Sequence, residues 1–167
     1  WIYENPNVLP RAYVSHHAEV ATDEDALARI REKTFDPWHT VLVRAPLSAE
    51  LEALIQTSRL SPVTPANVVA YEPHRVTIDV EDADPGILVL SDAWYPGWRV
   101  TVDGVPADLL RVNYALRGVY LGAGAHRVTF DFRPKTLYAG AGISTGALLV
   151  TAFIPWLERR RQKQDGR

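Results

Sequence analysis

The chain has 167 residues, of which 47% are hydrophobic, and its formal net charge is −2. This length suits one ordinary domain, and the hydrophobic content supports a packed core and argues against a disordered chain. The chain has no cysteine, which excludes disulfides and cysteine-ligated metals within it.

The first third of the chain mixes strand and helix patterns. It begins at Trp1 and has no methionine, so we expect it to be a piece of a longer protein. Residues 23–33 have the apolar spacing of a helix, which Thr22 or Asp23 can cap. Residues 47–56 fit either a second short helix or a loop. Two apolar stretches are typical of strands: residues 11–15 and 39–43.

After residue 66 the pattern has a period of two and is interrupted by turns, as in half-buried strands. Residues 86–90 (GILVL) form a continuous apolar run that indicates a central strand, and Asp103-Gly104 indicates a hairpin turn. Gly122, Gly124 and His126 mark another turn. Five further strands are expected: residues 75–80, 98–102, 107–112, 116–121 and 126–133. The pattern predicts a mainly β fold, an antiparallel β-sandwich or jelly-roll-like domain with one or two short helices.

A long uncharged run occupies the C-terminal part of the chain, from residue 137 to residue 157. As a helix it would be roughly 31 Å long, which matches the apolar thickness of a bilayer. Gly142 and Gly146 form a GxxxG pair, which lets helices approach closely in lipid. We therefore expect a transmembrane helix over 135–158 that packs against other spans of the same protein; the alternative is a buried helix of a soluble protein.

Charge gives this helix a direction. The tail 158–167 carries a net charge of +3, so the remaining residues carry −5. Basic residues concentrate on the cytoplasmic side of a span, so the tail 159–167 should be cytoplasmic and the β domain, 1–134, extracytoplasmic. The acidic body also argues against binding of nucleic acid, which requires a basic surface.

The most unusual stretch of the body is residues 94–98, WYPGW. Trp94 and Tyr95 could stack on the apolar faces of a sugar, with Asp92 or Arg99 binding its hydroxyls. The alternative is structural, since aromatic side chains usually serve packing, and Trp98 is the best candidate for the core. A third interpretation places the corner against the membrane or the missing membrane domain.

A second candidate site lies in residues 111–118, RVNYALRG. Arg111 and Arg117 could bind a phosphate of a lipid-linked sugar, because guanidinium groups match phosphate oxygens. Asn113 and Tyr114 lie between them, although Asn113 can simply adopt a turn conformation. The alternative is a solvated rim with ordinary salt bridges.

No other pattern indicates catalysis, a cofactor or a metal. The histidines lack the spacing of metal ligands, and the chain has no nucleophile motif such as GxSxG. We therefore predict no catalytic residue, no cofactor and no metal site. The five histidines should lie on the surface or in turns: His16, His17, His39, His74 and His126.

Several stretches of the sequence, taken in order, resemble the C-terminal region of bacterial YfhO-type membrane proteins. Among them are YEPHRVTIDV, LVLSDAWYPGWRVTVDG and RVNYALRGVYLGAGAHRVTFDFRP. Those proteins look like GT-C-type glycosyltransferases that use lipid-linked sugars, and the resemblance covers nearly the whole chain. It implies many preceding spans, with the catalytic acids in loops near the first ones, outside this chain.

The expected function is thus that of an accessory domain and last membrane span of a glycosyltransferase acting on cell-envelope polymers. The expected partners are the membrane, the missing N-terminal helices and a polyprenyl-phosphate-linked sugar or cell-wall glycan. The alternative is a non-catalytic carbohydrate-binding module or a purely structural one, anchored in the membrane. Whether the parent is an enzyme depends on sequence upstream of this chain.

Overall fold

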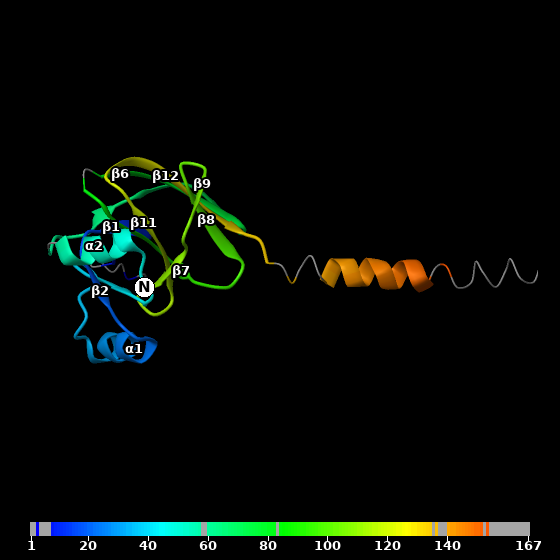
Figure 1. The fold of residues 1–167 in the computed structure, drawn as a ribbon, viewed down its shortest axis with the longest axis horizontal. Coiled ribbons are helices and arrows are strands. Elements are labelled where there is room, and N and C mark those ends of the chain that lie inside the picture. The colour runs from blue at the N-terminus through cyan, green and yellow to red at the C-terminus, as the bar shows by residue number, and fades with distance from the viewer. Residues whose placement is uncertain are drawn as a thin grey trace, which may run out of the picture. The chain divides into compact units, whose positions relative to one another are not determined.

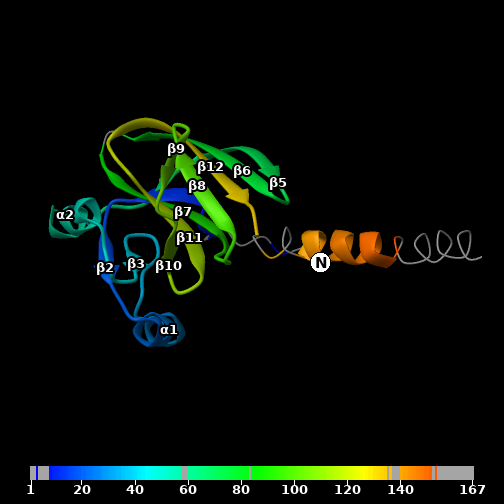
Figure 2. The same ribbon diagram turned by 45° about the vertical axis from the view of Figure 1, so that its right-hand side comes forward.

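The computed structural model describes residues 3, 8–57, 60–82, 84–134, 136, 140–151 and 153. The chain divides into two compact units, Trp1–Arg133 and Pro134–Arg167. The first unit is built mainly from β-strands in two sheets, so the predicted mainly β, antiparallel-rich fold is confirmed (Figures 1 and 2).

The larger sheet has seven strands in the order β2-β3-β10-β11-β7-β1-β4. Its strands are β1 (Ala12–Ser15), β2 (Ala18–Val20), β3 (Val41–Val43), β4 (Thr64–Pro65), β7 (Gly86–Ala93), β10 (Leu110–Val112) and β11 (Leu116–Leu121). Every pair is antiparallel except β2–β3, which is parallel and departs from the sequence prediction. The connection between these two strands contains a helix, as parallel neighbours require.

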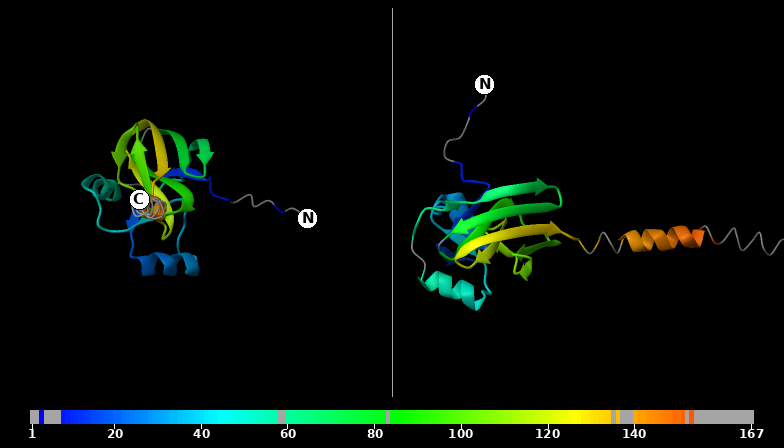
Figure 3. Two further views of the ribbon diagram at one scale, coloured as in Figure 1. Left: turned by 90° about the vertical axis from the view of Figure 1, so that its right-hand side faces the viewer. Right: turned by 90° about the horizontal axis from the view of Figure 1, so that it is seen from above.

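The smaller sheet has five antiparallel strands in the order β5-β6-β12-β8-β9. Its strands are β5 (Asn67–Glu72), β6 (Arg75–Asp82), β8 (Trp98–Val102), β9 (Val105–Ala107) and β12 (Gly124–Phe132). The long strand β12 pairs with β6 on one edge and with β8 on the other, and Figure 3 shows it in yellow. His126 lies within β12 and not in a turn, because the strand begins at Gly124.

The core lies between the two sheets. Alternation in β6 places Val76, Ile78 and Val80 on its buried face, as the sequence predicts. They pack with inward-facing residues of β1, β7, β8, β11 and β12, among which Phe130 is fully buried. Trp98 packs against the same cluster but is only partly buried.

Residues 86–90 of β7 are apolar without interruption, and the packing explains this. Leu88 and Leu90 join the core between the sheets, whereas Ile87 and Val89 join a second cluster on the other face of the seven-stranded sheet. A strand covered on both faces loses the usual alternation of polar and apolar residues. The prediction of a central strand over residues 86–90 is therefore confirmed.

Two short helices complete the first unit, and both lie near β2 and β3, away from β5 (Figure 2). Helix α1 (Asp23–Glu32) begins where the Thr22 hydroxyl accepts a hydrogen bond from the Asp25 amide, at 3.1 Å. Helix α2 (Ala49–Thr57) resolves the alternatives for residues 47–56 in favour of a helix. It contributes Leu51 and Leu54 to the cluster on the outer face of the larger sheet.

Two hairpin turns have the backbone that their sequences indicate. Asp103 and Gly104, with φ of 52° and 81°, join β8 to β9 in the left-handed conformation of a tight hairpin. Asn113 and Tyr114, with φ of 47° and 71°, do the same between β10 and β11. The turn conformation expected of Asn113 is thus confirmed.

In the second unit, residues 140–151 are helical. Gly142 and Gly146 are exposed there, and a Cβ at either would meet no atom within 4 Å. Among the described residues, no helix has both the length and the apolar character needed to cross a membrane. The predicted span over 135–158 extends beyond the described residues and stays a prediction, and the tail 159–167 lies wholly outside them.

Candidate functional site

Three of the predicted site residues come together where β7 ends beside the β10–β11 hairpin. The Arg111 guanidinium lies 5.9 Å from the centre of the Trp94 ring and 5.2 Å from that of Tyr114. These distances are typical of cation–π contacts. Trp94 is held in place by its backbone N–H, which donates to the Ala115 carbonyl at 2.7 Å. We call Trp94, Arg111 and Tyr114 the Trp94 cluster.

Helix α1 supplies a carboxylate to this cluster. Asp23 Oδ2 lies 3.3 Å from Arg111 Nη1 and 3.4 Å from Arg44 Nη1, so two arginines share one oxygen. Asp23 is a residue that sequence reasoning missed as a site residue. It is 88 positions from Arg111, and no local pattern connects them.

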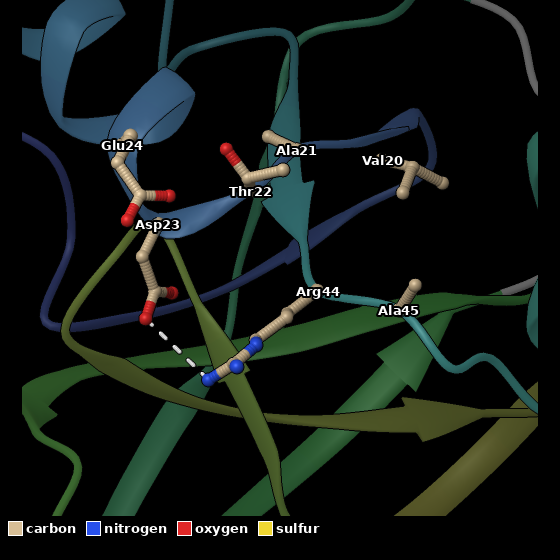
Figure 4. Close-up of a pocket in the computed structure, with 7 residues that line it drawn as sticks. All are labelled: Val20, Ala21, Thr22, Asp23, Glu24, Arg44 and Ala45. Carbon is tan, nitrogen blue, oxygen red and sulfur yellow. Dashed lines mark hydrogen bonds and ion pairs between the residues drawn. The ribbon is translucent and has the colours of Figure 1, made fainter.

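A pocket of about 310 Å³ opens beside Asp23. Its polar lining comes from Thr22, Asp23 and Glu24 at the start of α1 and from Arg44 after β3. Figure 4 shows the Asp23 carboxylate and the Arg44 guanidinium meeting at one side of this pocket. Since Asp23 also contacts Arg111, the pocket and the Trp94 cluster are connected through one side chain.

The indole N–H of Trp94 is buried and has no hydrogen-bond partner among the described residues. Tyr114 is 37% exposed, and the side chains of Arg111 and Asp23 are about one-third exposed, at 28% and 33%. Together with Asp23, the Trp94 cluster therefore combines two aromatic rings, a guanidinium and a carboxylate at a partly open surface.

Asn113 has a different environment from its neighbours in sequence. Its side-chain Oδ1 accepts a hydrogen bond from the Leu42 backbone N–H at 2.8 Å. Its backbone N–H donates to the Leu42 carbonyl at 2.9 Å. Its Nδ2 donates to the Tyr13 hydroxyl at 3.4 Å. The side chain is buried and connects the hairpin to β3 and β1, so it is not part of the Trp94 cluster.

Arg117 is also buried. It pairs with Asp92, with Nη2 2.9 Å from Oδ2, and the two side chains are 5% and 9% exposed. Its guanidinium lies 3.8 Å from the centre of the Trp98 ring. Burial lowers the pKa of the Arg117 guanidinium, and the Asp92 carboxylate opposes this effect. Arg111 and Arg117 are cross-strand neighbours, yet each pairs with a different carboxylate.

Asp92 joins Arg117 to the rim of the sandwich. Its Oδ1 lies 2.7 Å from Arg11 Nη2, and the Tyr71 hydroxyl donates to it. Arg11 also donates to the Tyr71 hydroxyl and lies over the Tyr71 ring. We call Arg11, Tyr71, Asp92 and Arg117 the end network; Arg11 and Tyr71 were not identified from the sequence.

Tyr95 lies apart from these groups. It is 63% exposed, and its ring centre is 6.4 Å from that of Phe132, which in turn contacts Trp98 at 5.2 Å. The neighbouring Gly97 carbonyl accepts from the Arg133 amide at 2.7 Å. The WYPGW corner therefore adjoins the last residue of the first unit. Ligand binding by the six predicted residues stays a prediction.

Among the described residues, no group of three or more histidine and carboxylate side chains is arranged to hold a metal ion. Each of the five histidines instead has a ring nitrogen 2.7–3.7 Å from a carboxylate oxygen; His126 Nδ1, for example, is 2.7 Å from Asp103 Oδ2.

No curated protein sequence matches the chain. Among solved structures, arabinofuranosyltransferase AftD from Mycobacteria is similar, with 28% sequence identity and a TM-score of 0.40. That similarity covers 46% of this chain and 6% of the AftD chain. A family described as "Bacterial membrane protein YfhO" matches residues 43–144, which is more than half of the chain. The chain therefore belongs to the YfhO family of bacterial membrane proteins.

Proposed function

We propose that this chain is the C-terminal accessory region of a membrane-embedded glycosyltransferase that acts on cell-envelope polymers. In this proposal the Trp94 cluster and the adjoining pocket bind the carbohydrate acceptor. Membership of a bacterial membrane protein family supports the membrane context. The observation that carries the binding role is the arrangement of Trp94, Tyr114, Arg111 and Asp23 at one partly open surface.

The chemistry of that surface suits a glycan. Aromatic rings such as Trp94 and Tyr114 offer flat apolar faces to the C–H faces of a sugar ring. Arg111 and Asp23 supply donors and acceptors for hydroxyl groups, and Arg44 and Glu24 extend them into the pocket. Arg111 can also bind a phosphate of the polymer, since guanidinium groups match phosphate oxygens.

Alanine substitution of Trp94, Arg111 or Tyr114 in the full-length protein should raise the KM for the acceptor by up to about tenfold. A tenfold change in affinity corresponds to about 1.4 kcal/mol, which is the order of magnitude of one hydrogen bond or one contact with an aromatic ring. The turnover number should change less, because the active site lies outside this chain in our proposal. Sugar transfer onto purified acceptor polymer would be measured at several acceptor concentrations.

Trp38→Ala is a matched control, since Trp38 is a partly exposed tryptophan outside the cluster. Circular dichroism would confirm that each variant is folded. If all three cluster variants kept the parental KM and turnover, the cluster would have no role in acceptor binding. The purely structural alternative would then be favoured, since Asp23 already pairs with both arginines.

We further propose that the β domain, 1–134, lies outside the cell and that residues 135–158 cross the membrane, with the tail 159–167 in the cytoplasm. The uncharged run and the basic tail support this orientation. Because the chain has no cysteine, single cysteines can report it. Val105→Cys, in the exposed β8–β9 hairpin, should react with an impermeant maleimide on intact cells.

A cysteine at Gln164 should be protected on intact cells and should react only after permeabilisation. Labelling of both positions on intact cells, or of neither, would contradict the orientation.

A further inference from the structure

A second pocket, of about 360 Å³, lies on the outer face of the seven-stranded sheet, and no residue of the Trp94 cluster or the end network lines it. Its walls are mainly apolar and come from the N-terminal approach to β1, from α1 and the segment after it, and from β11. The apolar lining residues are Leu9, Ile30, Phe35, Pro37 and Leu116. This volume lies at the lower end of the range for small-molecule sites. At about 30 Å³ for each water-sized group, it holds on the order of ten non-hydrogen atoms.

Two buried polar side chains form part of the lining. Tyr13 and Asn113 both line the pocket and are hydrogen-bonded to each other through Asn113 Nδ2 and the Tyr13 hydroxyl, at 3.4 Å. They are 0% and 8% exposed to water, respectively. The orientation of the Asn113 amide is fixed, because its Oδ1 accepts from the Leu42 amide. Nδ2 is therefore the donor and the tyrosine oxygen the acceptor.

This assignment leaves the Tyr13 O–H with no hydrogen-bond acceptor among the described residues. The second N–H of Asn113 Nδ2 also lacks an acceptor among them. A buried donor without an acceptor is costly, so such groups normally meet a water or a ligand. Burial raises the pKa of Tyr13 to about 12, so its hydroxyl keeps its proton and remains a donor at neutral pH.

Lys33 adds a positive charge to the lining. It ends α1 in the left-handed conformation, with φ of 56°, and its side chain is exposed. Among the described residues its ammonium has no ion-pair partner, whereas the arginines of the two clusters above are all paired with carboxylates. Ser91 is the remaining polar residue of the lining, and none of the described lining residues is acidic.

We propose that this pocket binds a compact organic anion, an apolar ring or short branched chain that carries a carboxylate or a phosphate. The apolar walls take the body of the ligand, and Tyr13 O–H and Asn113 N–H donate to its anionic oxygens. Lys33 neutralises the charge from the solvent side. A cationic ligand of the same size is excluded, because the pocket offers it a second positive charge and no carboxylate. The proposal does not depend on glycosyl transfer.

The test uses the full chain and two probes of suitable size, cyclohexanecarboxylate and phenyl phosphate, with cyclohexylmethylamine as the cationic counterpart. Binding would be followed by ligand-observed NMR against a blank without protein. We expect at least one anion to bind with a Kd on the order of 1 mM or tighter. The amine should show no binding over the same range.

Tyr13→Phe removes only the hydroxyl and should weaken anion binding by about tenfold or more, since hydrogen bonds to charged groups are strong. Tyr120→Phe removes a hydroxyl from a partly buried tyrosine that does not line the pocket, and it should leave the Kd unchanged. Lys33→Gln should weaken binding severalfold, and added salt should reduce that difference.

Three outcomes would overturn the proposal: no binding of either anion above the blank, equal binding of the amine, or a Kd that neither Tyr13→Phe nor Lys33→Gln changes. The first would mean that the pocket holds water only. If Tyr13→Phe fails to fold, Lys33→Gln still decides the question, because Lys33 is exposed.

Discussion

Replacing Asp92 by asparagine should lower the free energy of unfolding of the chain by about 3–5 kcal/mol, the usual cost of removing one partner of a buried ion pair. The Asp92 and Arg117 side chains are 9% and 5% exposed, so the guanidinium would lose its countercharge where water cannot replace it. Two further nitrogens of Arg117, Nε and Nη1, are buried without a hydrogen-bond partner among the described residues. Urea denaturation followed by tryptophan fluorescence would measure the change.

Asp131→Asn is the matched control, because Asp131 pairs with Arg75 at 2.8 Å in a more exposed place, where the two side chains are 20% and 46% exposed. Water screens that pair, so its loss should change stability little. Asp92→Leu combined with Arg117→Met should recover much of the lost stability, since an apolar pair has no buried charge. Equal effects of Asp92→Asn and Asp131→Asn would show that the end network does not depend on its buried charge.

Phe130→Ala should destabilise the chain by about 3–5 kcal/mol, because it removes a large side chain from a closely packed core and leaves a cavity. Phe130 is 0% exposed and lies between the two sheets on β12. Chemical denaturation of the variant would show this as a lower midpoint. Tyr95→Ala is the comparison, since Tyr95 is 63% exposed and its loss should stay within about 0.5 kcal/mol.

The Phe130 ring also lies 5.8 Å from the Arg117 guanidinium, so this substitution and Asp92→Asn act on neighbouring groups. Their effects on stability should therefore differ from a simple sum. A strictly additive double variant would indicate that the core and the end network are independent. A Phe130→Ala effect no larger than that of Tyr95→Ala would contradict the packing described for the core.

Local sequence patterns were sufficient to predict most strands of the first unit. Alternation identified β6 and the buried face that Val76 and Ile78 occupy, and the unbroken run of residues 86–90 identified a strand covered on both faces. The parallel pairing of β2 with β3 was not predicted. It depends on a helical connection and on which edge of the sheet is free, and three-residue strands carry too little pattern to show this.

The candidate site was predicted in part, because hairpin neighbours are close in sequence. Arg111 and Tyr114 lie within one hairpin, so their contact follows from local structure. Asp23 reaches Arg111 only through the folding of α1 onto the sheet, which no spacing rule reveals. Asn113 was expected near a ligand, and its burial against Leu42 depends on the pairing of β10 with β3.

The pairing of strand β12 has a mechanical consequence, because the chain continues from the end of this strand into the second unit. It is hydrogen-bonded along both edges, to β6 and to β8, and the Arg133 amide adds a bond to Gly97. Tension applied to the chain at residue 133 and directed along β12 would load these bonds in parallel, so they would have to break together. The first unit should therefore resist pulling along β12 better than pulling along an edge strand such as β5, which is hydrogen-bonded to β6 alone.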